Sequence, residues 1–267
     1  MGALITIEGG EYMGKTTLAI PGLESVSKRT GIPVLTSREP GGSPEAEQLR
    51  SEIFQKAETG ASAIELATLF NKARKIHLEE VVKPFLGSHK DQNALCILDR
   101  YLDSTRVYQG LEAGLTMEQI KEMEAEYVGD YLPDITIILS IPEQKFARLL
   151  LARQQLAKDT NHDNNIWDNA TIEKHLLRQR HYLSLPKLAA EWGERRGFAI
   201  IDVSQHPFQI IRAIVEAVGH YIDQHHLLTI SSVQKKMLNS WNELIKEPSW
   251  IYLEKAWKKQ EHIMRSL

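Results

Sequence analysis

Short apolar runs alternate along the chain with longer segments in which apolar residues recur at helical spacing. The short runs, which have the length expected of buried strands, are residues 4–8, 32–36, 94–98, 135–139 and 198–203. The longer segments, which we predict to be helices, are residues 16–28, 45–58, 62–86, 143–156, 170–194 and 208–222. Strands that alternate with helices favour a parallel sheet. The pattern therefore predicts an α/β fold with a five-stranded parallel sheet flanked by helices.

Local signals refine two of these helices. Pro21 and Gly22 predict a break or kink in the helix at 16–28, because proline lacks an amide donor. Ser43 followed by Pro44 is typical of a helix start, with a capping residue and then proline in the first helical position.

The first apolar run leads into a glycine-rich turn. Gly9, Gly14, Lys15 and Thr16 fill the template G-x-x-x-x-G-K-[ST] between a predicted strand and a predicted helix. Glycine lets the backbone curl so that its N–H groups point at an anion, which also lies at the positive end of the helix dipole. We expect this P-loop to bind the phosphates of a nucleoside triphosphate through Gly9, Gly10, Glu11, Gly14, Lys15, Thr16 and Thr17.

Two residues of the loop have expected individual roles. Lys15 would reach the β- and γ-phosphates, and the Thr16 hydroxyl would ligate the accompanying Mg²⁺. Asp99 and Arg100 directly follow the third apolar run. Because ligands of open α/β sheets bind beyond the carboxyl ends of the strands, both should face the same crevice, with Asp99 as a carboxylate that organises the metal.

Composition narrows the class of protein and its partners. Charged residues make up 25% of the chain and the net charge is -3, which gives no reason to expect nucleic acid or a membrane surface as a partner. Cys96 is the only cysteine, so an internal disulfide is excluded and a reducing compartment fits. No apolar stretch has the length of a membrane span, and no signal peptide opens the sequence. We therefore expect a cytoplasmic protein.

The C-terminal residues form an extension to the main domain, which we place at 1–224. In the extension, 225–267, apolar residues recur at helical spacing on both sides of Glu247-Pro248-Ser249, and Ser249 is a suitable helix cap. We expect a helical hairpin that packs on the main domain or across a dimer. A basic aromatic surface for a partner is the alternative.

Three segments of the chain together resemble the thymidylate kinase family. They are EGGEYMGKTT at 8–17, REPGGSPEAEQLR at 38–50 and DRYLDSTRVYQG at 99–110, with LFNKARKIH at 69–77 between the last two. The resemblance covers residues 1 to about 222. It implies transfer of the γ-phosphoryl group of ATP to dTMP, with Mg²⁺ bound, by a homodimer.

The resemblance also implies the acceptor site. Phe70 would stack on thymine and Arg74 would donate to a base carbonyl, while Arg38 and Arg100 would clamp the dTMP phosphate. Packing in the core is the alternative for Phe70. The remaining roles fall on Glu11 near the sugar hydroxyl, Tyr108 against the ribose 2′ position, Ser104, Thr105 and Gln109 around the base, and Glu39 near the metal ion.

One feature departs from the family pattern. Family members place a transition-state arginine in the phosphate loop or in the lid, which we expect at about 153–169. Here Tyr12 occupies the loop position, and Asn165 and Ile166 stand where the lid's acidic residue and arginine belong. Arg148, Arg153 and Lys158 are possible replacements, and we predict Arg153 as the catalytic residue because lid closure would bring it in. An exposed helical arginine is the alternative.

Two other functions stay open at this point. Without a completing cation, the chain would be a nucleotide-binding regulatory module with weak or no turnover. A kinase for another deoxynucleotide or for a nucleoside is the other possibility. Trp167, in the lid, is expected over the adenine.

Overall fold

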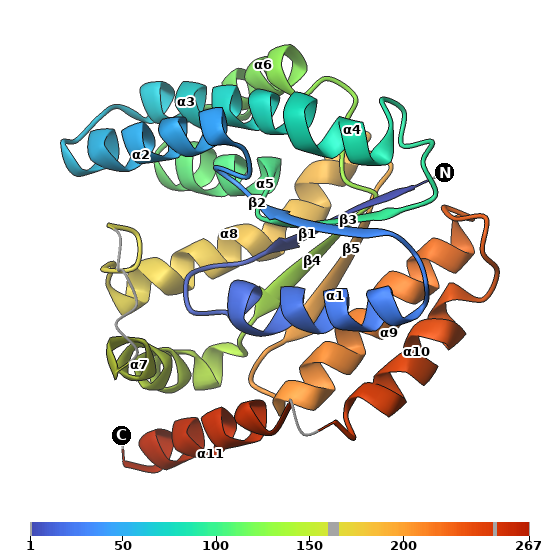
Figure 1. Ribbon diagram of the computed structural model, residues 1–267. Helices are drawn as coiled ribbons and strands as arrows, with labels where there is room; N and C mark the ends of the chain where they lie inside the picture. The colour runs from blue at the N-terminus through green and yellow to red at the C-terminus, as the bar shows by residue number, and fades with distance from the viewer. Residues whose placement is uncertain (1, 160–165, 248–249, 267) are drawn as a thin grey trace.

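Five parallel strands form one sheet with helices on both faces in the computed structural model, which describes residues 2–159, 166–247 and 250–266 (Figure 1). The strand order is β2-β3-β1-β4-β5. The strands are β1 Ala3–Glu8, β2 Val34–Arg38, β3 Leu95–Asp99, β4 Ile135–Ser140 and β5 Gly197–Asp202. Every neighbouring pair is parallel, which confirms the predicted α/β class.

Strand β2 begins and ends two residues later than predicted. Pro33 precedes it, and proline has no N–H group to give to a ladder. The strand therefore extends to Arg38, which pairs in register with Asp99 of β3. This register places two predicted site residues side by side at the carboxyl edge of the sheet.

The helix after the phosphate loop consists of two parts. Residues Lys15–Ala19 form a π-helical segment, η1, and Ile20–Arg29 form α1, with Pro21 in its first turn. The backbone stays in the right-handed helical region at Ala19 and Ile20, where the two parts join, so the helix changes type just before Pro21 without an interruption. Gly22 lets α1 approach helix α9, Pro207–Gln224, because a Cβ atom there would come within 2.7 Å of Ile211.

Most of the chain between β2 and β4 outside β3 is helical. Ser43 caps α2, Pro44–Glu58, as predicted, by accepting from the amide of Ala46. The predicted helix at 62–86 is observed as α3 Ala63–His77, η2 Leu78–Val82 and α4 Lys83–Leu86. Three elements were not predicted at all: α5 Leu102–Thr105, η3 Arg106–Glu112 and α6 Met117–Tyr127.

Helices α7, Glu143–Asp159, and α8, Ile172–Glu191, flank the expected lid. Part of the residues predicted as lid, 153–159, is therefore helical, and the structure describes Ile166, Trp167 and Asp168 before α8. Asn165 and the side chain of Lys158 lie outside the described residues.

The C-terminal extension contains the two predicted helices, α10 Val233–Leu244 and α11 Ile251–Ser266. They do not pair along their length as a hairpin: α10 packs on α9 and α1, whereas α11 packs on α7 and α9 (Figure 1). The reason is that the main domain buries their apolar faces, since Met237, Trp241 and Leu253 belong to the same core cluster as β1. The predicted cap Ser249 lies outside the described residues. Within the described residues, no helix is long and apolar enough to span a membrane.

Candidate active site

The phosphate loop connects β1 to η1 and needs glycine at both ends. Gly9 has a φ of 138°, and a Cβ atom there would lie 2.8 Å from the carbonyl oxygen of Leu139. Gly14 has a φ of 83° and precedes η1 in the left-handed region. A side chain at either position would strain the loop. The sequence therefore dictates the curled backbone that offers its amides to a phosphate.

Lys15 points back into this loop. Its Nζ donates to the carbonyl oxygens of Gly9 at 3.0 Å and Gly10 at 2.7 Å. Burial, together with the nearby Arg100, lowers the pKa of Lys15 to about 8. The ammonium group is therefore charged at neutral pH and already lies beside the loop amides.

Thr16 and Asp99, both predicted at the metal, are in direct contact. The Thr16 hydroxyl donates to Oδ2 of Asp99 at 2.5 Å. A hydroxyl and a carboxylate are hard oxygen ligands, and Mg²⁺ usually binds through one or two such protein groups plus substrate phosphates. The two residues fit this ion. No larger cluster of His, Cys, Asp and Glu suited to a metal exists among the described residues.

Glu39 is engaged elsewhere. Its two carboxylate oxygens lie 2.7 Å from Nε of Arg74 and 3.1 Å from Nδ1 of His77, and its side chain is 3% exposed. In this arrangement Glu39 fixes Arg74 on the wall of the acceptor site. Its role as a metal ligand stays a prediction.

Arg100 lies at the centre of the crevice. Its backbone has a φ of 69°, and its guanidinium donates to Tyr182 at 2.7 Å and to Ser104 at 3.0 Å, with Glu11 3.4 Å away. Arg38, at the end of β2, is exposed and pairs with Glu47 at 3.0 Å. Both arginines are at the same edge of the sheet, and Arg38 is the one that solvent reaches freely.

Three of the predicted base-binding residues, Phe70, Arg74 and Ser104, line one small cavity of about 20 Å³, whereas Thr105 and Gln109 do not. Phe70, Arg74, Arg100 and Ser104 line it, together with Glu39, Pro40 and Tyr101. Arg74 is nearly fully buried and also donates to Thr105 at 3.2 Å. Gln109 is buried in η3. The volume is too small for a nucleotide.

Trp167 lies on this acceptor side and not where adenine was expected. Its ring packs against Phe70, with 6.1 Å between ring centroids, and against Phe54 at 5.6 Å and Tyr108 at 6.4 Å. The indole is partly buried here because aromatic side chains of α2, α3 and η3 offer it an apolar surface.

Glu11 holds a buried ionic cluster that the sequence predicted only in part. Its carboxylate accepts from Tyr108 and from Arg178 of α8, and Nδ1 of His175 lies 3.2 Å away. Burial raises the pKa of Glu11, but His175, Arg100 and Arg178 outweigh it and hold the pKa well below its usual value. Glu11 is therefore ionised.

Arg178 and His175 were missed because nothing local in α8 distinguishes them. Both are nearly fully buried, yet in the sequence they are polar residues of an ordinary amphipathic helix. Only the fold brings them to the loop. Arg178 is fixed from its other side by Glu112, whose carboxylate accepts from Nε at 2.6 Å.

Arg153 is held away from the crevice. Its guanidinium donates to the carbonyl oxygens of Tyr12 at 2.9 Å and Val203 at 2.6 Å, and to the Gln260 side chain at 3.1 Å. Reaching a phosphate would mean leaving these acceptors. In this structure Arg153 therefore braces the back of the phosphate loop, and its predicted catalytic role stays a prediction.

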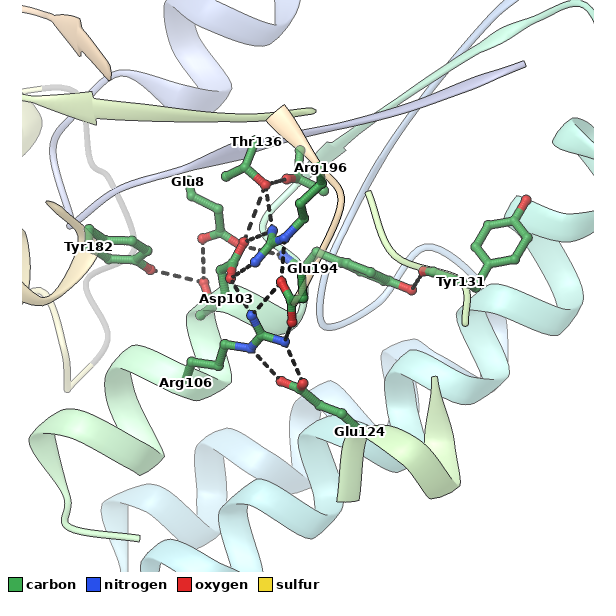
Figure 2. A network of polar contacts seen from close by, with 12 residues as sticks. Glu8, Asp103, Arg106, Glu124, Tyr131, Thr136, Tyr182, Glu194 and Arg196 are labelled. Atoms are coloured by element: carbon green, nitrogen blue, oxygen red, sulfur yellow. Dashed lines mark hydrogen bonds and ion pairs between the residues drawn. The ribbon is translucent and has the colours of Figure 1, made fainter. Parts of the chain in front are cut away.

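A second ionic network joins the helical segment after Arg100 to neighbouring elements (Figure 2). Arg106 of η3 makes two hydrogen bonds to Glu124, at 2.8 and 2.6 Å, and also reaches Glu194. Arg196 pairs with Asp103 at 2.5 and 2.7 Å. Burial raises the pKa of Asp103, but Arg196 outweighs it and the pKa is lowered. The network joins the segment after Arg100 to α6 and to the start of β5.

The fold and the site define a P-loop nucleotide-binding protein: a glycine loop follows the central strand of a parallel sheet, and Thr16 meets Asp99 beside it. A model of the thymidylate kinase family matches residues 7–183. The chain therefore belongs to the thymidylate kinase family.

Individual relatives agree with this assignment. A thymidylate kinase of Bacillus velezensis is 30% identical over 227 residues, which are 85% of this chain and 99% of that protein. One from Mesoplasma florum is 36% identical over 82% of this chain and 96% of its own length. The crystal structure of thymidylate kinase from Ehrlichia chaffeensis has the same fold, with a TM-score of 0.54 at 21% identity, and covers 91% of this chain and 98% of its own.

Proposed function

We propose that the protein transfers the γ-phosphoryl group of ATP to dTMP and so produces ADP and dTDP. The observation that carries this proposal is the placement of the phosphate loop beside Arg38 and Arg100, at the carboxyl ends of neighbouring strands β1, β3 and β2. Two anionic nucleotides can meet there with their phosphoryl groups facing each other. Membership of the thymidylate kinase family supports the same substrates.

The chain's own residues would mainly position and neutralise charge. Lys15 exchanges its bonds to the loop carbonyls for oxygens of the transferring phosphoryl group. Thr16 and Asp99 would hold Mg²⁺, which would neutralise phosphate charge when bound. Arg38 and Arg100 clamp the acceptor phosphate as the nucleophile. That phosphate is already ionised, so no general base is needed.

The acceptor base would enter the pocket of Phe70 and Arg74. Phe70 stacks on thymine, and the Arg74 guanidinium, fixed by Glu39, donates to a carbonyl of the base. Tyr108 crowds the ribose 2′ position, which favours deoxynucleotides. Because the Trp167 ring packs against Phe70, stacking of a base on Phe70 would require Trp167 to move.

We also propose that the enzyme works in the cytoplasm as a homodimer, with Mg²⁺ as its metal. The dimer rests on the family resemblance, and the compartment rests on Cys96 being the only cysteine. A module without turnover is not favoured, because the relatives are named as kinases.

An assay of ADP release with a panel of acceptors tests the proposal. We expect ADP with dTMP, much less with dCMP, dGMP or thymidine, and none with the Lys15→Ala variant. Binding of ATP and dTMP without formation of ADP would overturn it in favour of a regulatory module. A preference for another acceptor would point to a different kinase.

A further inference from the structure

A cavity of about 380 Å³ lies between helix α7, the turn after β5 and the C-terminal helix α11. This volume falls in the range of small-molecule sites in proteins. Its walls include Lys145, Arg148 and Leu149 of α7, Ser204 of the turn, and Trp257 and Met264 of α11. Helix α11 lies beyond residues 7–183, which match the family, so this wall is an addition of the extension.

Arg153 connects the cavity to the phosphate loop. Its guanidinium donates to Val203 and Gln260, each of which directly precedes a residue of the cavity wall. The same guanidinium donates to the carbonyl oxygen of Tyr12, at 2.9 Å, in the phosphate loop. A single side chain therefore connects the phosphate loop to two residues that are sequence neighbours of the cavity walls.

The cavity lies on the donor side of the loop. In the order β2-β3-β1-β4-β5, the phosphate loop follows the central strand β1. The acceptor residues Arg38 and Arg100 follow β2 and β3, whereas α7 and the turn of Ser204 follow β4 and β5. A triphosphate in the loop that points its γ-phosphoryl group at the acceptor must extend its nucleoside toward β4 and β5.

The chemistry of the walls suits the base of a nucleotide. Trp257 supplies an aromatic surface, and the ring of His206 holds it edge-on at 5.4 Å. Lys145, Arg148 and Arg265 line the cavity together with one acidic residue, Glu261, so positive charge is in excess on its walls. Bases stack on aromatic side chains, and cations favour the phosphate-bearing end of the same molecule.

We propose that α11 forms the outer wall of the donor-base pocket and that Trp257 contacts the purine of ATP. The proposal rests on the proposed function, because it takes ATP as the donor. It gives the C-terminal extension a part in substrate binding as well as in the core.

Steady-state kinetics of the full chain test the proposal. Because stacking on an aromatic side chain is worth about 1–3 kcal/mol per base, Trp257→Ala should raise the KM for ATP by about fivefold or more. The KM for dTMP should change by less than about twofold, since the acceptor pocket lies on the other side of the loop. Trp257→Phe should restore much of the loss. Lys255→Ala, on the exposed side of α11, is the matched control and should leave both KM values unchanged.

Two further measurements test the proposal even if the Trp257→Ala variant does not fold. Met264→Trp fills the cavity and should also raise the KM for ATP, whereas a purely structural α11 predicts no such rise. In the unmodified chain, ATP alone should slow hydrogen exchange in residues 251–266, and dTMP alone should not. An unchanged KM for ATP in the folded variants, or no protection by ATP, would overturn the proposal. Failure of the proposed function can be distinguished from failure of this proposal. If the proposed function is wrong, the unmodified chain forms no dTDP, but the exchange experiment still shows whether ATP protects residues 251–266.

Discussion

The guanidinium of Arg178 and the carboxylate of Glu11 form a buried ion pair, with Nη1 3.0 Å from Oε2, that joins α8 to the phosphate loop across 167 positions of sequence. Their side chains are 2% and 5% exposed. The pair brings a fixed cation to the loop in a chain whose loop carries Tyr12 where an arginine was expected. Arg178 is therefore a candidate for the role of the transition-state arginine that other family members carry in the phosphate loop or the lid.

Arg178→Ala is expected to lower kcat by about 100-fold or more, because arginines that stabilise a transferring phosphoryl group contribute about 10³–10⁵-fold. A coupled assay at saturating ATP and dTMP measures kcat, and circular dichroism confirms that the variant is folded. The matched control is Arg180→Ala, an exposed neighbour paired with Glu143, which should stay within about twofold. A folded Arg178→Ala protein with unchanged kcat would rule out this role.

Arg153→Ala is expected to act on stability and not on chemistry. Loss of the hydrogen bonds to Tyr12, Val203 and Gln260 should cost about 2–4 kcal/mol of unfolding free energy. Urea denaturation measures the loss. At saturating substrates kcat should fall by less than about tenfold. A fall of about 1000-fold in a folded variant would instead support the catalytic role that the sequence predicts.

Glu8 makes stability depend on pH. Burial, together with Asp103, raises the pKa of Glu8 from 4.5 to about 7. The folded state thus favours the protonated acid, so the stabilising contribution is full below pH 4.5 and is lost as pH rises through about 7. The side chain of the Glu8→Gln variant cannot ionise. The free energy of unfolding of this variant minus that of the unmodified chain should therefore be about 1–3 kcal/mol larger at pH 8 than at pH 5. Urea denaturation measures both proteins at both pH values. If the difference in unfolding free energy between them is the same at pH 5 and pH 8, the raised pKa of Glu8 is refuted.

Asp99→Asn should raise the Mg²⁺ concentration needed for half-maximal rate by about 10–100-fold, because it removes the carboxylate beside Thr16. Titration of MgCl₂ at fixed ATP measures this. Glu39→Gln is the comparison: its carboxylate holds Arg74, so we expect a higher KM for dTMP with an unchanged Mg²⁺ requirement. A raised Mg²⁺ requirement in Glu39→Gln would make it the metal ligand that the sequence predicts.

Trp241→Ala should destabilise the chain by about 3–5 kcal/mol, because this buried side chain of α10 belongs to the main core. Thermal or urea unfolding measures the loss. Lys235→Ala, exposed on the same helix, should change little. A truncation after Gln224 that stays folded and active would contradict the structural role of the extension.

Much of the fold and part of the site could be predicted because their signals are local. The phosphate loop needs glycine at Gly9 and Gly14, and the alternation of short and long apolar segments requires a parallel sheet. Helix α6 was missed although Thr116 and Gln119 form a capping box, which is a readable signal.

Other features depend on contacts that no local pattern encodes. Arg153 and Arg178 are both arginines on amphipathic helices, yet one braces carbonyl groups and the other pairs with Glu11. Trp167 packs on Phe70 because the fold, and not the sequence near it, presents an apolar surface there. The separation of α10 from α11 follows from the same cause, since each helix finds its apolar partner in the main domain.

The packing of α10 and α11 has a consequence for synthesis on the ribosome. Chains grow from the N-terminus, and domains generally fold as units in that order. Here Met237 and Trp241 of α10 complete the core around β1, although α10 is synthesised long after that strand. Nascent chains should therefore lack a finished interior until α10 has emerged, and release before that point would leave an apolar surface open to chaperones and proteases.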